Sequence, residues 1–227
     1  MRVPTTLGEL YVEDHGHGPP VVLWHSFLHH GGMWRAQVDA LVSRHRVLVI
    51  DAPGHGRSGR VERDFDMSDC AVAATQVMDA CGLDRVAWCG LSWGGMVGMT
   101  LAIEHPTRLG ALVVMDTSCR EEPRKNRIEY RLLGTIFRNI GMAPFLLRKV
   151  EKLFFTEDTR RNDRAMVDEW AGYVARLDRE STWKALHCIF DRRDLTEALA
   201  RVRIPTLVIC GELDKAQPLR ESKAIAA

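Results

Sequence analysis

The sequence predicts an α/β protein with a mostly parallel sheet, helices on both sides of it and one helical insertion. Short apolar runs typical of strands alternate with segments whose apolar residues recur at helical spacing. The strand-like runs are apolar throughout, as expected for strands covered on both faces. Between residues 118 and 200 such runs disappear. These three observations favour one α/β core into which helices are inserted.

Strands and helices alternate along the first half of the chain. The run PVVLWH at residues 20–25 predicts a strand, and Trp34, Val38, Leu41 and Val42 then recur at helical spacing. A helix is expected between Asp66, which can cap its N-terminus, and Gly82, which tolerates a left-handed C-terminal position. Further strands are expected at residues 46–51, 85–90 and 109–116, and a nearly all-apolar helix at residues 93–105, before Pro106.

Residues 118–200 are expected to form a helical cap over the strand ends. Arginine, glutamate and aromatic residues recur there at helical spacing, as in the set Phe145, Leu146, Lys149, Leu153 and Phe154 around an amphipathic face. Strand character returns at residues 204–211 (IPTLVICG), and Pro218 is suited to open a helix. We therefore expect residues 1–117 and 201–227 to form the core.

Composition excludes several classes of function. The net charge of +1 supplies no basic field for nucleic acid or anionic lipid. No apolar run has a membrane-spanning length, and the N-terminus does not resemble a secretion signal, so we expect a cytoplasmic protein with neither nucleic-acid nor membrane partners. The six cysteines show no CxxC pairing, which favours free thiols over a disulfide framework or a metal site.

The segment Gly90-Leu91-Ser92-Trp93-Gly94 fits the pattern G-x-S-x-G between a predicted strand and a predicted helix. Such a sharp turn holds the serine in a strained conformation, and side chains two residues away would collide with it. The turn also places Ser92 at a helix N-terminus, where the N–H of Trp93 and the helix dipole can stabilise an oxyanion. The motif therefore predicts a nucleophilic serine.

With this motif, the chain resembles the α/β-hydrolase family from about Gly8 to its end. Three further segments match in order: His25-Ser26-Phe27 at the family's oxyanion loop, residues 51–58 (DAPGHGRS) at the turn after its fourth strand, and residues 211–214 (GELD) at the loop bearing its acid. The family's usual His-Gly is His-Ser here. This variant, with GLSWGG, is similar to the 3-oxoadipate enol-lactonase branch and to carboxylesterase members.

The resemblance implies a role for each matching residue. Ser92 would be the nucleophile, and the backbone N–H groups of Phe27 and Trp93 would form the oxyanion hole. Asp214 would orient the base, with Asp116 as the alternative acid. His25 and the aromatic residues Trp170 and Trp183 are candidates for the substrate pocket, although packing within the cap explains the two tryptophans equally well. No metal or organic cofactor is implied.

The base of the expected triad is missing from its family position. A serine hydroxyl needs a neighbouring base, which in this family is a histidine after the acid, and no histidine follows Asp214. We therefore expect a C-terminally truncated hydrolase that lacks the last strand and helix and has impaired activity. His29, His30 and His187 are weaker substitutes, because none has the family's position.

These observations favour a serine hydrolase that cleaves a small ester or lactone through an acyl-enzyme. A non-catalytic ligand-binding protein on the same scaffold is the alternative from another class, and a C–C bond hydrolase or perhydrolase is the alternative within the family. The acyl group, the leaving group and the oligomeric state stay open, because the fold does not fix the substrate.

Overall fold

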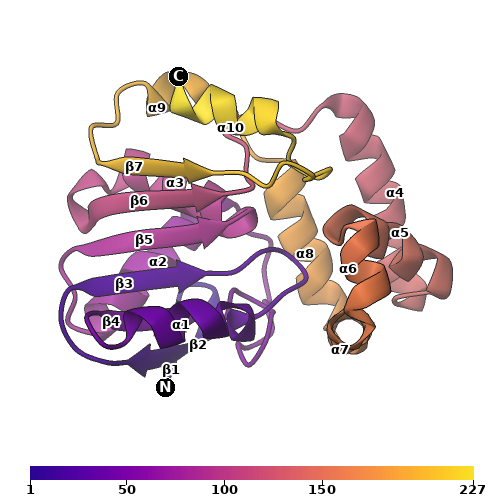
Figure 1. The fold of residues 1–227 in the computed structure, drawn as a ribbon, viewed down its shortest axis with the longest axis horizontal. Coiled ribbons are helices and arrows are strands. Elements are labelled where there is room, and N and C mark those ends of the chain that lie inside the picture. Colours follow the sequence, from indigo (N-terminus) through magenta and orange to yellow (C-terminus); the bar gives the residue numbers. More distant parts are fainter.

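The computed structural model describes all 227 residues and contains one seven-stranded sheet, in the order β1-β2-β4-β3-β5-β6-β7 (Figure 1). The strands are β1 (Arg2–Thr5), β2 (Gly8–His15), β3 (Pro20–Trp24), β4 (Arg46–Ile50), β5 (Val86–Leu91), β6 (Leu109–Met115) and β7 (Thr206–Ile209). β3 to β7 are parallel, whereas β1 and β2 are joined antiparallel at one edge. The prediction of a mostly parallel sheet is confirmed.

Helices cover both faces of this sheet. The helices of the whole chain are α1 (Arg35–Leu41), α2 (Met67–Ala80), α3 (Trp93–Glu104), α4 (Arg124–Ile140), α5 (Pro144–Phe154), α6 (Glu157–Asn162), α7 (Arg164–Val174), α8 (Arg179–Phe190), α9 (Thr196–Leu199) and α10 (Leu219–Ala226), with short 3-10 turns η1 (Gly31–Trp34) and η2 (Pro106–Arg108). α2, α3 and part of α10 pack on one face around a core containing Trp24, Trp88 and Trp93. α1 packs on the other face, against Leu23 and Val49.

The expected ends of α2 are confirmed. The Asp66 carboxylate accepts a hydrogen bond from the Asp69 N–H while the Asp69 carboxylate accepts one from the Asp66 N–H, a reciprocal capping box. Gly82, just after the helix, has φ +67°, which a residue with a side chain rarely adopts. The two predicted signals thus fix both ends of this helix, which packs against α3 and β1.

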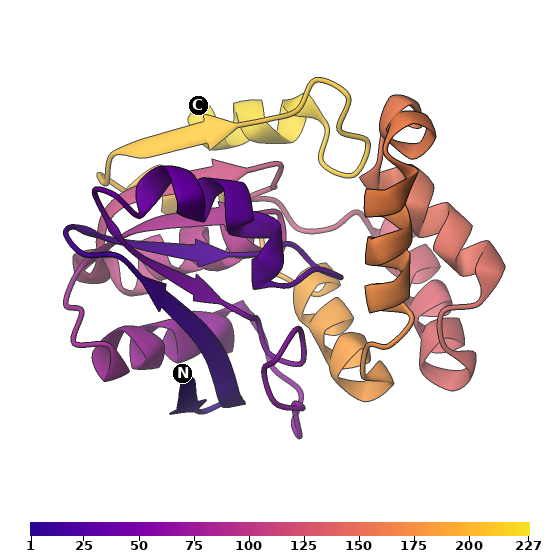
Figure 2. The same cartoon turned by 60° about the horizontal axis from the view of Figure 1, so that its bottom comes forward.

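Helices α4 to α8 form a group beyond the carboxyl ends of the parallel strands, as both ribbon views show (Figures 1 and 2). The predicted absence of strands between residues 118 and 200 is confirmed. The two connections to this helical group run side by side, because the Leu195 N–H donates to the Cys119 carbonyl at 2.7 Å. The group is therefore held at a fixed position over the strand ends.

Two further predictions can be compared with the structure. All six cysteines are free thiols, as expected. No helix combines the length and the apolar character needed to cross a bilayer.

The β7 strand forms the second edge of the sheet. It pairs only with β6, and Leu207 and Ile209 are 55% and 43% exposed on the sheet face that carries α1.

Candidate active site

Ser92 lies at a tight turn between β5 and α3 and adopts φ +52° and ψ −105°. The glycines around it are required by crowding. A Cβ atom on Gly90 would lie 2.1 Å from the carbonyl oxygen of Gly94, and one on Gly94 would lie 2.2 Å from the carbonyl oxygen of Trp24. The strained turn predicted from the sequence is therefore present.

Hydrogen bonds from three elements hold this turn. The Ser92 N–H donates to the Met115 carbonyl at 2.8 Å, and the hydroxyl of Thr117 donates to the Ser92 carbonyl at 2.8 Å. The indole N–H of Trp88 donates to the Gly94 carbonyl at 2.9 Å. Because these bonds come from β5, β6 and the loop after β6, the backbone of the Ser92 turn is fixed relative to the sheet.

The loop after β3 contains the other expected oxyanion donor. Neither the Phe27 nor the Trp93 backbone N–H has a hydrogen-bond partner within the chain. Leu28, next to Phe27, has φ +58°, and its carbonyl accepts a hydrogen bond from the Trp170 indole at 3.1 Å. The loop is thus held in a strained conformation that leaves the Phe27 N–H free.

Two of the three pocket candidates lie elsewhere. His25 is fully buried, with Nδ1 at 2.7 Å from the Ser26 carbonyl and Nε2 accepting from the Ala52 N–H at 2.8 Å. Burial lowers the pKa of His25 well below its usual range, so the ring is neutral and joins two loops. Trp170 is 5% exposed, and its indole N–H donates a hydrogen bond to the Leu28 carbonyl. Both side chains support the site instead of lining the cavity.

His55 belongs to the same buried support. Its Nδ1 lies 3.0 Å from the Pro53 carbonyl, and its ring lies 5.3 Å from that of Trp93 and 5.7 Å from that of Phe27, centroid to centroid. Burial lowers the pKa of His55 to about 4, so the ring is neutral near pH 7. His55 therefore packs beneath the site, between the rings of Trp93 and Phe27.

Asp116 and Asp214 follow β6 and β7, at neighbouring strand ends. Asp116 has φ +43° and accepts a hydrogen bond from the Gly211 N–H at 2.7 Å. Asp214 accepts from the N–H groups of Ala216 and Gln217 at 2.7 and 2.9 Å. Burial raises the pKa of Asp214, and the nearby charge of Asp116 raises it further. The geometry brings both candidate acids together at the carboxyl ends of β6 and β7.

Ser92 opens into a cavity of about 390 Å³, here called the elbow cavity, between the strand ends and α4, α5 and α8. Phe27 and Trp183 line it with Ser92, and 16 of its 24 lining residues are hydrophobic, which suits an apolar ligand. Lining residues that were not expected include Leu133, Phe137, Leu186, Ile189 and Gln217. Helical spacing placed Leu146 and Leu153 on one face, but spacing alone does not say which cavity a face lines.

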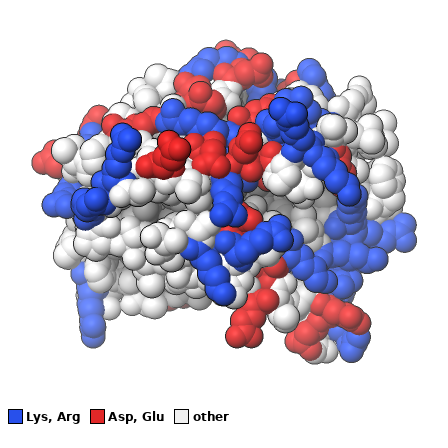
Figure 3. Space-filling view, turned by 90° about the horizontal axis from the view of Figure 1, so that it is seen from above, with Lys and Arg blue, Asp and Glu red and all other residues white.

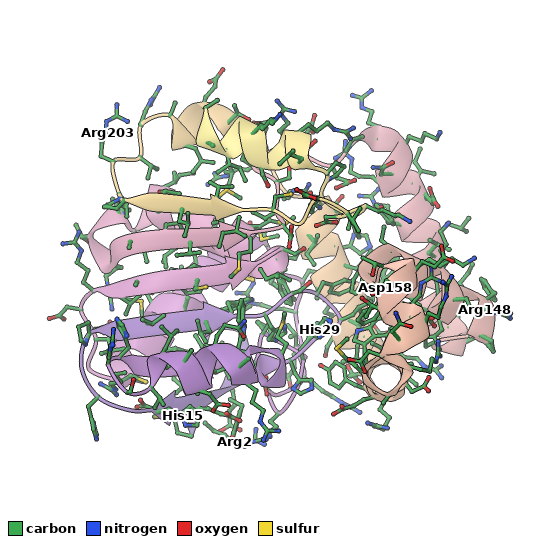
Figure 4. All side chains as sticks on the ribbon, viewed as in Figure 1. Arg2, His15, His29, Arg148, Asp158 and Arg203 are labelled. Atoms are coloured by element: carbon green, nitrogen blue, oxygen red, sulfur yellow. The ribbon has the colours of Figure 1, made fainter.

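None of the nine histidines forms a hydrogen bond with the Ser92 hydroxyl. His29 stacks on Phe154 where the core meets the helical group (Figure 4), and burial lowers its pKa to about 4. His30 accepts from the Gly32 N–H, and His187 pairs with Asp191. The three histidines weighed as substitute bases are therefore engaged elsewhere.

The chain belongs to the alpha/beta hydrolase fold family, which matches residues 19–227. It is 29% identical, over 96% of its length and 82% of the relative's, to "Putative carbamate hydrolase RutD" of Azorhizobium caulinodans. All of the chain superposes on 85% of a thermophilic esterase from Thermogutta terrifontis, with 29% identity and a TM-score of 0.92. It also superposes on 86% of the enol-lactonase from Burkholderia xenovorans, with 25% identity and a TM-score of 0.92. The expected family is confirmed, and the protein is an α/β-hydrolase.

Proposed function

We propose that this α/β-hydrolase cleaves a small carboxylic ester or lactone through an acyl-enzyme on Ser92. The observation that carries the proposal is the strained Ser92 turn, which opens into an apolar cavity beside two backbone N–H groups without partners. Nothing in folding alone requires these three features together. The esterase and the enol-lactonase that share the fold support the substrate class.

In the proposed reaction the Ser92 oxygen attacks the carbonyl carbon while its proton passes to a base. The carbonyl oxygen becomes an oxyanion and accepts hydrogen bonds from the Phe27 and Trp93 N–H groups, aided by the N-terminal end of the α3 dipole. The C–O bond then breaks and the leaving oxygen takes the proton. Water attacks the acyl-serine by the same steps, releasing the acid and restoring Ser92. This route requires no metal or organic cofactor.

We propose Asp214 as the residue that orients the base, with Asp116 as the alternative. Residues 118–200 would act as the cap that closes the elbow cavity, and Trp183 would contact the substrate. Acidic and basic side chains are interspersed on the face seen in Figure 3, which agrees with a small-molecule substrate rather than nucleic acid. A cytoplasmic location stays a prediction.

We propose that turnover by these 227 residues is impaired, because the Ser92 hydroxyl has no histidine to take its proton. Loss of the base from a triad typically removes several orders of magnitude of rate. The same observation favours the second candidate function, a ligand-binding protein without turnover. A C–C bond hydrolase or perhydrolase would use the same serine and oxyanion groups.

The test is hydrolysis of p-nitrophenyl butyrate by the chain and by Ser92→Ala, each with and without added imidazole. Imidazole is small enough to enter a cavity of about 390 Å³ and can serve as the missing base. We expect slow turnover that depends on Ser92 and rises with imidazole concentration. An imidazole response equal in the two proteins would reject catalysis by Ser92. Ligand binding that is unchanged by Ser92→Ala, without turnover, would favour the binding protein.

A further inference from the structure

A second cavity, of about 480 Å³, lies on the other side of α8 from the elbow cavity and is here called the side cavity. It is bounded by residues 64–68 and by one stripe of α8, and its lining residues include Asp64, His187 and Asp191 beside apolar ones such as Phe65 and Met67. The elbow cavity is bounded by the opposite stripe, which includes Thr182, Leu186 and Ile189. α8 therefore separates the apolar elbow cavity from a cavity with both polar and apolar lining residues.

Trp183 is the only residue that lines both cavities. Its ring lies at 4.3 Å from the His187 ring, centroid to centroid, and the Arg138 guanidinium lies 5.6 Å from its centre. A Cβ atom on Gly134 of α4 would lie 2.8 Å from the Trp183 ring, so a glycine is needed there to seat it. The indole is packed on several sides, as a fixed partition would be.

We propose that Trp183 sets the upper length limit of the substrate by separating the elbow cavity from the side cavity. This inference rests on the proposed function, because it concerns the substrate of the same site. A straight-chain ester that fills the elbow cavity would meet the indole. Without the indole, its chain could continue into the side cavity, where polar lining residues such as Asp64 and Asp191 suit a terminal hydroxyl group.

The first test measures binding and needs no turnover. Dissociation constants for methyl butanoate, methyl octanoate and methyl 8-hydroxyoctanoate would be measured calorimetrically on Ser92→Ala and on Ser92→Ala with Trp183→Ala. Each additional buried methylene strengthens binding by up to about fourfold. We expect the preference for octanoate over butanoate to rise at least tenfold when Trp183 is removed, and the hydroxyl group to weaken binding only while Trp183 is present.

Matched variants separate the partition from a general gain of space. Leu186→Ala enlarges only the elbow cavity, so it should shift the length preference much less than Trp183→Ala. Adding His187→Trp to Trp183→Ala refills the opening from the side cavity and should reverse the shift. Trp183→Leu keeps an apolar side chain at the position and should give an intermediate shift, so the test stands if the alanine variant folds poorly.

The second test measures kcat/KM for p-nitrophenyl acetate, butyrate and octanoate with the Ser92 protein, in imidazole where needed. The same shift toward octanoate is expected for Trp183→Ala. Hydrolysis independent of Ser92 together with the binding shift would reject the proposed function and keep the partition. An unchanged length preference in folded Trp183 variants, an equal shift in Leu186→Ala, or no ester binding to any variant would overturn the partition.

Discussion

The buried ion pair between Arg192 and Glu122 offers a sharp test of how the helical group is attached. Their side chains are 5% and 8% exposed, and Arg192 Nη2 lies 3.0 Å from Glu122 Oε2. Arg192 also donates to the carbonyls of Arg120 and Ile189, both at 2.8 Å. One side chain thus joins the segment entering the helical group to the segment leaving it.

Arg192→Met should destabilise the fold strongly. The substitution leaves the Glu122 carboxylate buried with one remaining partner, the Asn126 amide at 2.7 Å. Removing one partner of a buried pair costs about 3–5 kcal/mol. For a chain of this size, each kcal/mol of lost stability lowers the melting temperature by about 2–4 °C, so we expect the melting temperature to fall by roughly 6–20 °C.

The assay is thermal and urea unfolding followed by circular dichroism. Arg193→Met is the matched control, because Arg193 is 62% exposed and pairs with Glu104 at the surface, where a pair contributes about 1 kcal/mol or less. Combining Arg192→Met with Glu122→Leu removes both charges and should recover most of the loss. The reasoning is refuted if Arg192→Met unfolds like Arg193→Met, or if the double variant is as unstable as the single one.

Three other features give independent predictions. Gly94→Ala should destabilise by at least about 2 kcal/mol, because the new methyl group would overlap the Trp24 carbonyl; a urea midpoint equal to the parent's would contradict this. The raised pKa of Asp214 means that its ionisation opposes folding above pH 3.8, so Asp214→Asn should stabilise the fold at pH 7 and have little effect at pH 3, as measured by urea unfolding at both values. Lysine at Leu207 and Ile209 should reduce self-association through the free edge and exposed face of β7; sedimentation velocity that shows no change would rule out association there.

The sequence predicted the parallel core because those strands are apolar on both faces. β1 and β2 were not predicted, since they lie at the sheet edge and mix buried residues such as Leu10 and Val12 with exposed polar ones. An antiparallel edge strand with one solvated face leaves no continuous apolar run to recognise. Only the central strands therefore have the continuous apolar runs that identify a strand in the sequence.

The sequence predicted the backbone conformation of the site better than the positions of its side chains. The crowded glycines specify the Ser92 turn locally, so its conformation follows from a short motif. The positions of His25 and Trp170 depend on carbonyl and N–H groups far along the chain, at Ala52 and Leu28. Nothing in the spacing of the sequence indicates that hydrogen bonds to these distant partners hold both rings outside the cavity.

Backbone strain marks this site more specifically than its cavity does. Leu28, Ser92 and Asp116 are the only residues other than glycine with positive φ, and they follow β3, β5 and β6 at the same end of the sheet. Each such residue costs of the order of 1–3 kcal/mol and persists only where its surroundings hold it. Here a separate hydrogen bond holds each one: from the Trp170 indole to Leu28, from the Thr117 hydroxyl to Ser92, and from the Gly211 N–H to Asp116. These three donors lie on three different segments, and because Thr117 directly follows Asp116, the loop after β6 links the strain at the nucleophile to the strain at a candidate acid.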